Sequence, residues 1–186
     1  MRVNVEMVAG IVGLVVLMGV PSVAVAQNAG EIAGGYQFMR DFALDENFPA
    51  GWFVSGAGNL SDNIALVGEV SGSQKSESFF DVTADADILA FLGGVRVGAS
   101  AGPVIPFAQV LVGGARAKVT LRGFGERESS SETAFALQPG GGVDIPFAEN
   151  VSARAMVDYR RIFFHDDSGA NEVRVAVGIV VGFGGN

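Results

Sequence analysis

The sequence predicts an all-β fold, an eight-stranded antiparallel up-and-down β-barrel. Three observations favour it. Apolar and polar residues alternate in eight separate segments, short connections alternate with longer polar ones, and both ends of the strand-rich region fall on the side of the short connections. The 186-residue chain also has 27 glycines but only 6 prolines, which suits strands that pack closely or bend.

The first residues have the features of a signal peptide. Arg2 stands before an uncharged apolar run at residues 8–20, which leads to the triplet Ala24-Val25-Ala26. A short apolar run that ends in such a site is typical of a cleavable leader, and an uncleaved anchor or a buried helix is the alternative. We therefore expect a signal peptide at residues 1–26 and one barrel domain at residues 27–186.

Charge and cysteine content narrow the class of protein. The formal net charge of -8 argues against a nucleic-acid partner, which would need a basic face. The chain has no cysteine, so an exported domain of this size must be stabilised by continuous hydrogen bonding and packing. After residue 26 no apolar run is long enough for a membrane helix.

Eight segments of the mature chain have the alternation of strands. The last fifteen residues show it best, because Val173, Val177 and the residues in step with them are apolar, whereas the other parity holds Arg174. The eight predicted strands are residues 31–39, 51–60, 64–73, 85–99, 106–121, 133–145, 151–163 and 172–183.

The connections between these segments differ systematically in length. Residues 60–63, 100–105 and 146–150 form short turns. The longer polar loops are residues 40–50, 74–84, 123–132 and 164–171. Short turns at one end and long loops at the other are typical of outer-membrane barrels, so the predicted barrel is transmembrane and its predicted location is the cell outer membrane. A soluble, secreted small barrel is the competing fold.

A partial repeat supports paired hairpins. Ile105-Pro106-Phe107-Ala108 opens the fifth segment, and Ile145-Pro146-Phe147-Ala148 closes the sixth. Both should lie at one rim, where a proline is tolerated and a phenylalanine suits an interfacial aromatic girdle.

Charged residues almost always fall on the parity opposite the large apolar residues. In the fifth segment, for example, Leu111 and Ala115 oppose Arg116 and Lys118. We assign the apolar parity to lipid and the other parity to an interior too narrow for large side chains, filled rather than open. Burying a charge unpaired costs several kcal/mol, so the interior charges must pair. The predicted lumen network is Glu69, Arg96, Arg116, Lys118, Arg154, Asp158 and Arg174, with Asp144 as a further acid.

Several segments resemble a known family. They are Gly34-Gly35-Tyr36-Gln37-Phe38 and residues 106–115, 133–144, 154–161 and 171–184. Together they are similar to the small outer-membrane β-barrel domain proteins, the OmpA/OmpX-like eight-stranded group. The resemblance implies a periplasmic N-terminus and insertion by the outer-membrane assembly machinery, and it implies no particular activity. It also makes Phe183 a candidate assembly signal, although three residues follow it.

We expect a structural or surface-interaction role through the outer loops, with an interior plugged by charged side chains. The alternatives are a narrow passive channel and a lipid-modifying enzyme. The only histidine, His165, lies near Ser168 and Glu172, but this loop has little to hold a catalytic base in place. We therefore expect no catalytic residue, cofactor or metal. The expected partners are outer-membrane lipid and the assembly machinery, and the expected state is a monomer.

Overall fold

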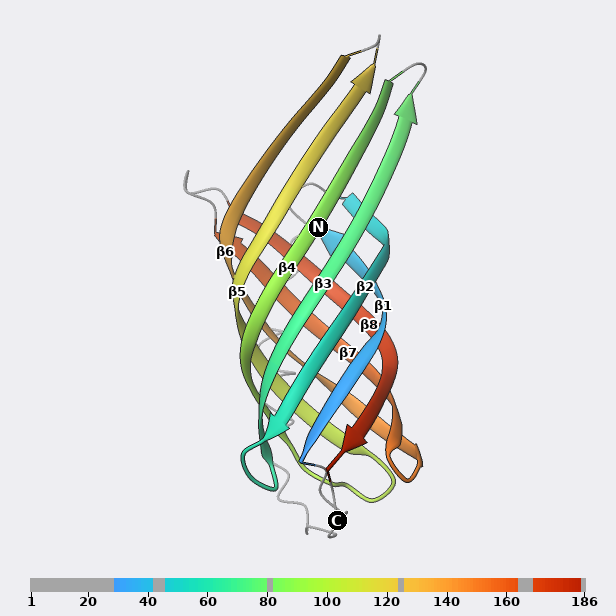
Figure 1. Ribbon diagram of the computed structural model, residues 1–186, viewed down its shortest axis with the longest axis vertical. Helices are drawn as coiled ribbons and strands as arrows, with labels where there is room; N and C mark the ends of the chain where they lie inside the picture. Colours follow the sequence, from blue (N-terminus) through green and yellow to red (C-terminus); the bar gives the residue numbers. More distant parts are fainter. Residues whose placement is uncertain (1–28, 42–45, 80–81, 124–125, 164–168, 185–186) are drawn as a thin grey trace, which may run out of the picture.

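The computed structural model describes residues 29–41, 46–79, 82–123, 126–163 and 169–184. They form one closed antiparallel barrel, in which every strand pairs with its neighbours in the chain and β1 pairs with β8 (Figure 1). The strands are β1 (Gly30–Asp41), β2 (Glu46–Asn59), β3 (Ile64–Phe79), β4 (Val82–Gly98), β5 (Ile105–Gly123), β6 (Glu126–Ala148), β7 (Val151–Phe163) and β8 (Gly169–Phe183). The predicted barrel of eight strands is confirmed, and the predicted signal peptide lies outside the described residues.

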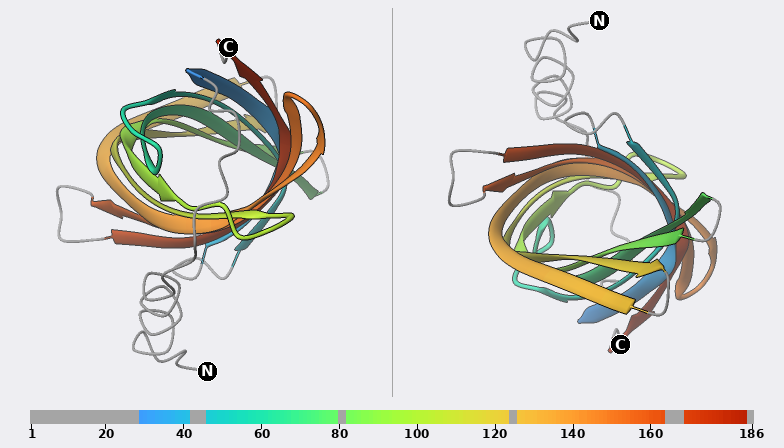
Figure 2. Two further views of the ribbon diagram at one scale, coloured as in Figure 1. Left: turned by 90° about the horizontal axis from the view of Figure 1, so that it is seen from below. Right: turned by 90° about the horizontal axis from the view of Figure 1, so that it is seen from above.

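The barrel wall separates an apolar outer face from a mixed inner face. Seen along its long axis, the wall forms a closed ring (Figure 2). On β8, Val177 and Val181 are about half exposed and face outward, whereas Arg174 and Ala176 are buried inside. The predicted faces of β3, β4, β7 and β8 are confirmed. In the described ranges, no helix has the length and apolar character needed to span a membrane.

The predicted face of β5 is wrong. Leu111 and Ala115 are buried inside the barrel, so Arg116 and Lys118 point outward from the other parity. The half of β5 nearer the short turns carries no charge on either face, and the charges begin only at Arg116, nearer the outer end of the barrel. There a charged side chain can meet water on the outside, so charge does not mark the inner face.

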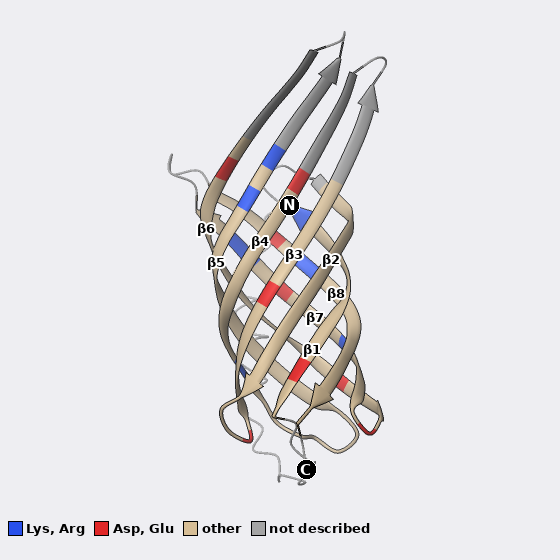
Figure 3. Cartoon of the chain, viewed as in Figure 1, with Lys and Arg blue, Asp and Glu red and all other residues tan. Residues whose placement is uncertain are grey.

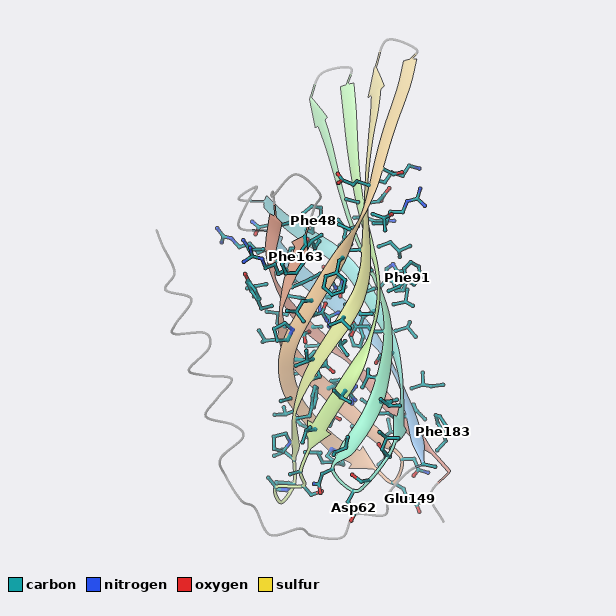
Figure 4. The ribbon with its side chains drawn as sticks, turned by 90° about the vertical axis from the view of Figure 1, so that its left-hand side faces the viewer. Phe48, Asp62, Phe91, Glu149, Phe163 and Phe183 are labelled. Carbon is teal, nitrogen blue, oxygen red and sulfur yellow. The ribbon has the colours of Figure 1, made fainter. Side chains whose placement is uncertain are left out.

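One end of the barrel carries the short turns, as predicted. Residues 60–63, 99–104 and 149–150 connect strands there. Figure 4 shows Asp62, Glu149 and Phe183 at this end, far from Phe163 at the other. The two Ile-Pro-Phe-Ala segments both lie at this rim, but only Phe147 faces outward. The expectation that Phe107 joins an aromatic girdle is wrong, because the parity of β5 directs this ring into the interior.

The opposite end is built differently from the prediction. Four strands, β3 to β6, are 16, 17, 19 and 23 residues long and project beyond the others, which have 12 to 15 residues (Figure 1). Most of the residues predicted as loops at 74–84 and 123–132 continue these ladders. These segments are mostly polar in sequence, so the pattern predicts loops, whereas hydrogen bonding between neighbouring strands continues the strands.

Candidate functional site, a charged column inside the barrel

Acidic and basic positions recur along the length of the barrel (Figure 3). The centre of the interior is occupied by Arg174, which is fully buried on β8. Its Nε and Nη2 donate to Oδ2 of Asp158 on β7 at 2.9 and 2.6 Å. Its Nη1 donates to Oε1 of Glu69 on β3 at 2.6 Å, and to Oε1 of Gln37 on β1 at 2.9 Å. One guanidinium thus connects strands on opposite sides of the lumen.

A second group lies towards the short-turn end. Arg154 on β7 makes a bidentate pair with Asp144 on β6, with both donor–acceptor distances 2.7 Å. The Nη2 atom of Arg154 also donates to Glu31 on β1 at 2.8 Å, and Arg96 on β4 pairs with the same oxygen of Glu31. Phe107 contacts both cations, because its ring centroid lies 4.7 Å from Cζ of Arg96 and 4.9 Å from Cζ of Arg154. A glutamate of the first strand is thereby bonded to strands across the barrel.

A third group lies towards the outer end. Arg160 on β7 donates to Oε1 of Gln138 at 2.7 Å and to Oγ of Ser71 at 3.0 Å. Its Nη1 atom also lies 3.5 Å from a carboxylate oxygen of Glu172 on β8. The side chain of Arg160 is buried, so these groups replace the water that a guanidinium would otherwise bind.

Two glutamines connect the three groups into one hydrogen-bonded column. Gln109 accepts from Arg96 at 3.1 and 3.2 Å and donates to Oδ1 of Asp158 at 3.1 Å. Gln138 accepts from Arg160 and donates to Glu69 at 3.4 Å. The column therefore runs from Glu31 near the short-turn end to Arg160 near the outer end.

The charges of the column nearly cancel. Among the side chains that the structure describes, it contains four arginines and five carboxylates, which leaves one formal negative charge. The members are Arg96, Arg154, Arg160 and Arg174 with Glu31, Glu69, Asp144, Asp158 and Glu172. Each arginine lies within 4.0 Å of at least one of these carboxylates, which offsets the cost of taking it out of water.

Two clusters of apolar side chains also lie buried inside the barrel. One cluster includes Leu92, Leu111 and Ile162, and a second includes Phe53 and Phe107. The expectation that the interior is too narrow for large side chains is therefore wrong. Glycines that face the interior leave space for these large side chains. A Cβ atom on Gly178, for example, would lie 2.8 Å from the ring of Phe53.

Five of the seven predicted network residues lie in the column, namely Glu69, Arg96, Arg154, Asp158 and Arg174. Arg116 and Lys118 do not belong to it, because they point outward from β5. The prediction missed Glu31, Gln37, Gln109, Gln138, Arg160 and Glu172 as members. Glu31, Gln37, Gln138, Arg160 and Glu172 have the inward parity of their strands, which could have found them, whereas Gln109 shares the parity of Leu111, the face of β5 that was assigned to lipid. The glutamines carry no charge to draw attention, although their amides complete the hydrogen bonds.

The structure gives little information on two other predicted features, the assembly signal at Phe183 and the loop that contains His165. Phe183 is about half exposed, faces outward at the end of β8 and pairs with Gly30 of β1. This position does not test its role in assembly. His165 lies outside the described residues. Within the described part of the chain, no group of three or more His, Cys, Asp or Glu residues could hold a metal ion.

Comparisons with known proteins agree with this geometry. The family described as outer membrane protein beta-barrel domain matches residues 11–184. The attachment invasion locus protein Ail of Yersinia pestis has a similar structure, with a TM-score of 0.61 and 16% sequence identity over 83% of this chain and 99% of that chain.

Two further solved structures are similar. Neisserial surface protein A has a TM-score of 0.62 and 12% identity over 83% of this chain and 96% of that chain. A major outer membrane protein from Thermus thermophilus has a TM-score of 0.58 and 11% identity over 83% of this chain and 100% of that chain. No curated protein matches the chain. At these identities the structural likeness concerns the fold alone.

Proposed function

Because the chain belongs to the outer membrane protein beta-barrel domain family and is located in the outer membrane, we propose that it is a non-conducting barrel that presents a rigid sheet outside the cell. The charged column inside the barrel supports the proposal that the barrel does not conduct. The projection of β3 to β6 beyond the other strands supports the proposal that a sheet is presented outside the cell.

The column supports closure because it crosses the lumen at its centre. Arg174 is held between Asp158 and Glu69, whose strands lie on different sides of the barrel. An ion path along the axis would have to separate these buried charges, and leaving one of them unpaired costs several kcal/mol. A narrow passive channel is the competing proposal.

Conductance measurements in planar bilayers distinguish the closed barrel from the passive channel. We expect the purified, folded protein to show no steady single-channel conductance, in bilayers where an open porin conducts under the same conditions. Folding is checked by a difference in gel migration between unheated and heated samples. Steady conductance steps from the folded protein would contradict the closed interior and support the channel.

The projecting sheet supports a contact role because neither of its edges pairs with another described strand. Within the described residues, the β2–β3 ladder stops at the pair Ala50–Gln74 and the β6–β7 ladder begins at Phe135–Phe163. The backbone of residues 75–79 and 126–134 therefore has a strand on one side only. Such an edge can accept an extended segment of another molecule through main-chain hydrogen bonds.

A shortened barrel tests this role. Residues 75–86 and 119–130 are replaced by short turns, and cells carrying the full or the shortened chain are compared for adherence to protein-coated surfaces. We expect adherence to fall while barrel abundance and heat-dependent gel migration stay unchanged. Equal adherence of both strains would contradict the contact role.

We further propose that the barrel inserts through the outer-membrane assembly machinery, that Phe183 contributes to this recognition, and that the folded chain is a monomer surrounded by lipid. A lipid-modifying enzyme is the competing proposal of another class. It would be supported by purified protein that changes lipid acylation, with the change lost in His165→Ala.

A further inference from the structure

Two outward-facing arginines stand where the apolar outer face of β5 to β7 ends. Arg116 lies on β5 and Arg161 on β7, and both side chains are exposed. On the same strands, the outward residues closer to the short-turn end are apolar. They include Val110, Val112, Ile145, Ala155 and Val157.

An exposed aromatic pair lies between the two cations. Phe135 of β6 and Phe163 of β7 face each other across the ladder, and their ring centroids are 5.8 Å apart. Cζ of Arg161 lies 5.3 Å from the centroid of Phe163. On the other side, Nη2 of Arg116 donates to Oγ of Ser131 on β6 at 3.1 Å. We name Arg116, Phe135, Arg161 and Phe163 the rim patch.

The arginines of the rim patch differ from those inside the barrel in their partners. Every arginine of the column lies within 4.0 Å of a carboxylate. Among the residues that the structure describes, no carboxylate lies within that distance of Arg116 or Arg161. Lys118 faces outward as well, but its cross-strand neighbour on β4 is Asp87. Within the described part of the chain, the two guanidinium groups therefore have no carboxylate partner, and they lie on a face of the barrel that borders lipid.

We propose that the rim patch binds the phosphate group of a lipid in the outer leaflet. Guanidinium groups bind phosphate with two parallel hydrogen bonds, and Phe135 and Phe163 provide an apolar surface beside Arg161. The position favours a lipid over a soluble anion, because the cations lie at the edge of the apolar wall, where the charged headgroups of an outer leaflet stand. This site is independent of any contact made by the projecting sheet.

The test measures lipid retained by the purified full chain in detergent, by native mass spectrometry. The probes are a lipid A with two phosphates, the same lipid with its phosphates removed, and inorganic phosphate as a competitor. The variants are R116Q/R161Q, the charge-conserving R116K/R161K, and Lys118→Gln, which removes an outward cation outside the patch. Heat-dependent gel migration confirms that each variant is folded, and the single variants Arg116→Gln and Arg161→Gln replace the double variant if it does not fold.

We expect R116Q/R161Q to bind the phosphorylated lipid about tenfold more weakly than the native chain, in line with the attraction of two cations to an anionic headgroup. R116K/R161K should bind the phosphorylated lipid more tightly than R116Q/R161Q and more weakly than the native chain, because lysine keeps the charge but loses the paired hydrogen bonds. Lys118→Gln should stay within about threefold of the native chain, and the lipid without phosphates should bind the native chain and R116Q/R161Q equally. Equal retention of both lipids by the native chain, or unchanged binding in R116Q/R161Q, would overturn the proposal. Displacement of the lipid by millimolar inorganic phosphate would also overturn it, in favour of a site for a soluble anion.

Discussion

At the scale of single residues, Arg174 shows how buried charges hold this barrel closed. It bonds Asp158 and Glu69 at once, so its removal would leave two carboxylates buried without their shared cation. We expect Arg174→Ala to lower the free energy of unfolding by about 3–5 kcal/mol, the usual cost of breaking a buried pair from one side. Urea unfolding in lipid vesicles measures it. Arg161→Ala, at an exposed position, is the control and should change the value by less than about 1 kcal/mol.

Gly140 is the second residue at which a small change should have a large effect. A Cβ atom there would overlap the carboxylate of Asp158, which is already fixed by Arg174 and Gln109. We expect Gly140→Ala to destabilise the barrel by about 1–3 kcal/mol, as overpacking does. The same urea titration measures it.

Gly58 supplies the matched control for this substitution. No heavy atom lies within 4 Å of a Cβ placed there, and the residue faces outward on β2. Gly58→Ala should therefore leave the free energy of unfolding unchanged or slightly raised. A similar loss of stability in both variants would show that the contact between Gly140 and Asp158 is not the cause.

The charged residues also show where alternation in the sequence correctly predicts which side chains face the interior and where it does not. Arg96, Arg154 and Arg174 each stand opposite a clear apolar parity, and all three lie in the interior. Arg116 and Lys118 have the same local pattern but face outward. The difference is height along the barrel, which depends on the stagger of the strands and is not encoded in alternation.

At the scale of the strand, the outward face of β8 is the part that must tolerate lipid. Val177 lies in the middle of this face, whereas Ile64 lies at the short-turn rim as the first residue of β3. We expect Val177→Arg to cost about 2–4 kcal/mol and Ile64→Arg no more than about 1 kcal/mol, because the cost of a lipid-facing charge depends on depth. Urea unfolding in vesicles compares the two. Equal costs would contradict the assignment of this face to lipid.

Strand ends were the least predictable elements. The core of each strand follows from alternation, but β6 begins at Glu126 rather than near residue 133, and β3 continues to Phe79. The added residues of β6, Glu126 to Glu132, are all polar or charged in sequence. Their strand conformation depends on hydrogen bonds to the neighbouring strand, which no local sequence signal reports.

At the scale of the whole molecule, the single tryptophan reports how the barrel sits in lipid. Trp52 faces outward on β2, is 45% exposed, and is paired with Tyr36 of β1. We expect lipids with brominated acyl chains to quench its fluorescence strongly, and iodide in the water to quench it weakly, because the ring lies in the lipid belt. The reverse pattern would place this face of the barrel in water.

The sequence by itself determined the number of strands, their order, the end that carries the short turns and the inward position of most charges. These features follow because side chains alternate between the two faces of a strand, and because one face of a barrel strand borders lipid while the other borders the interior. Only the tertiary structure decided which charges meet, because the partners of Arg174 lie 16 and 105 residues away and are brought together by barrel closure and strand stagger. It also decided the outward face of β5 and the projecting sheet, since both depend on where each strand crosses the edge of the lipid.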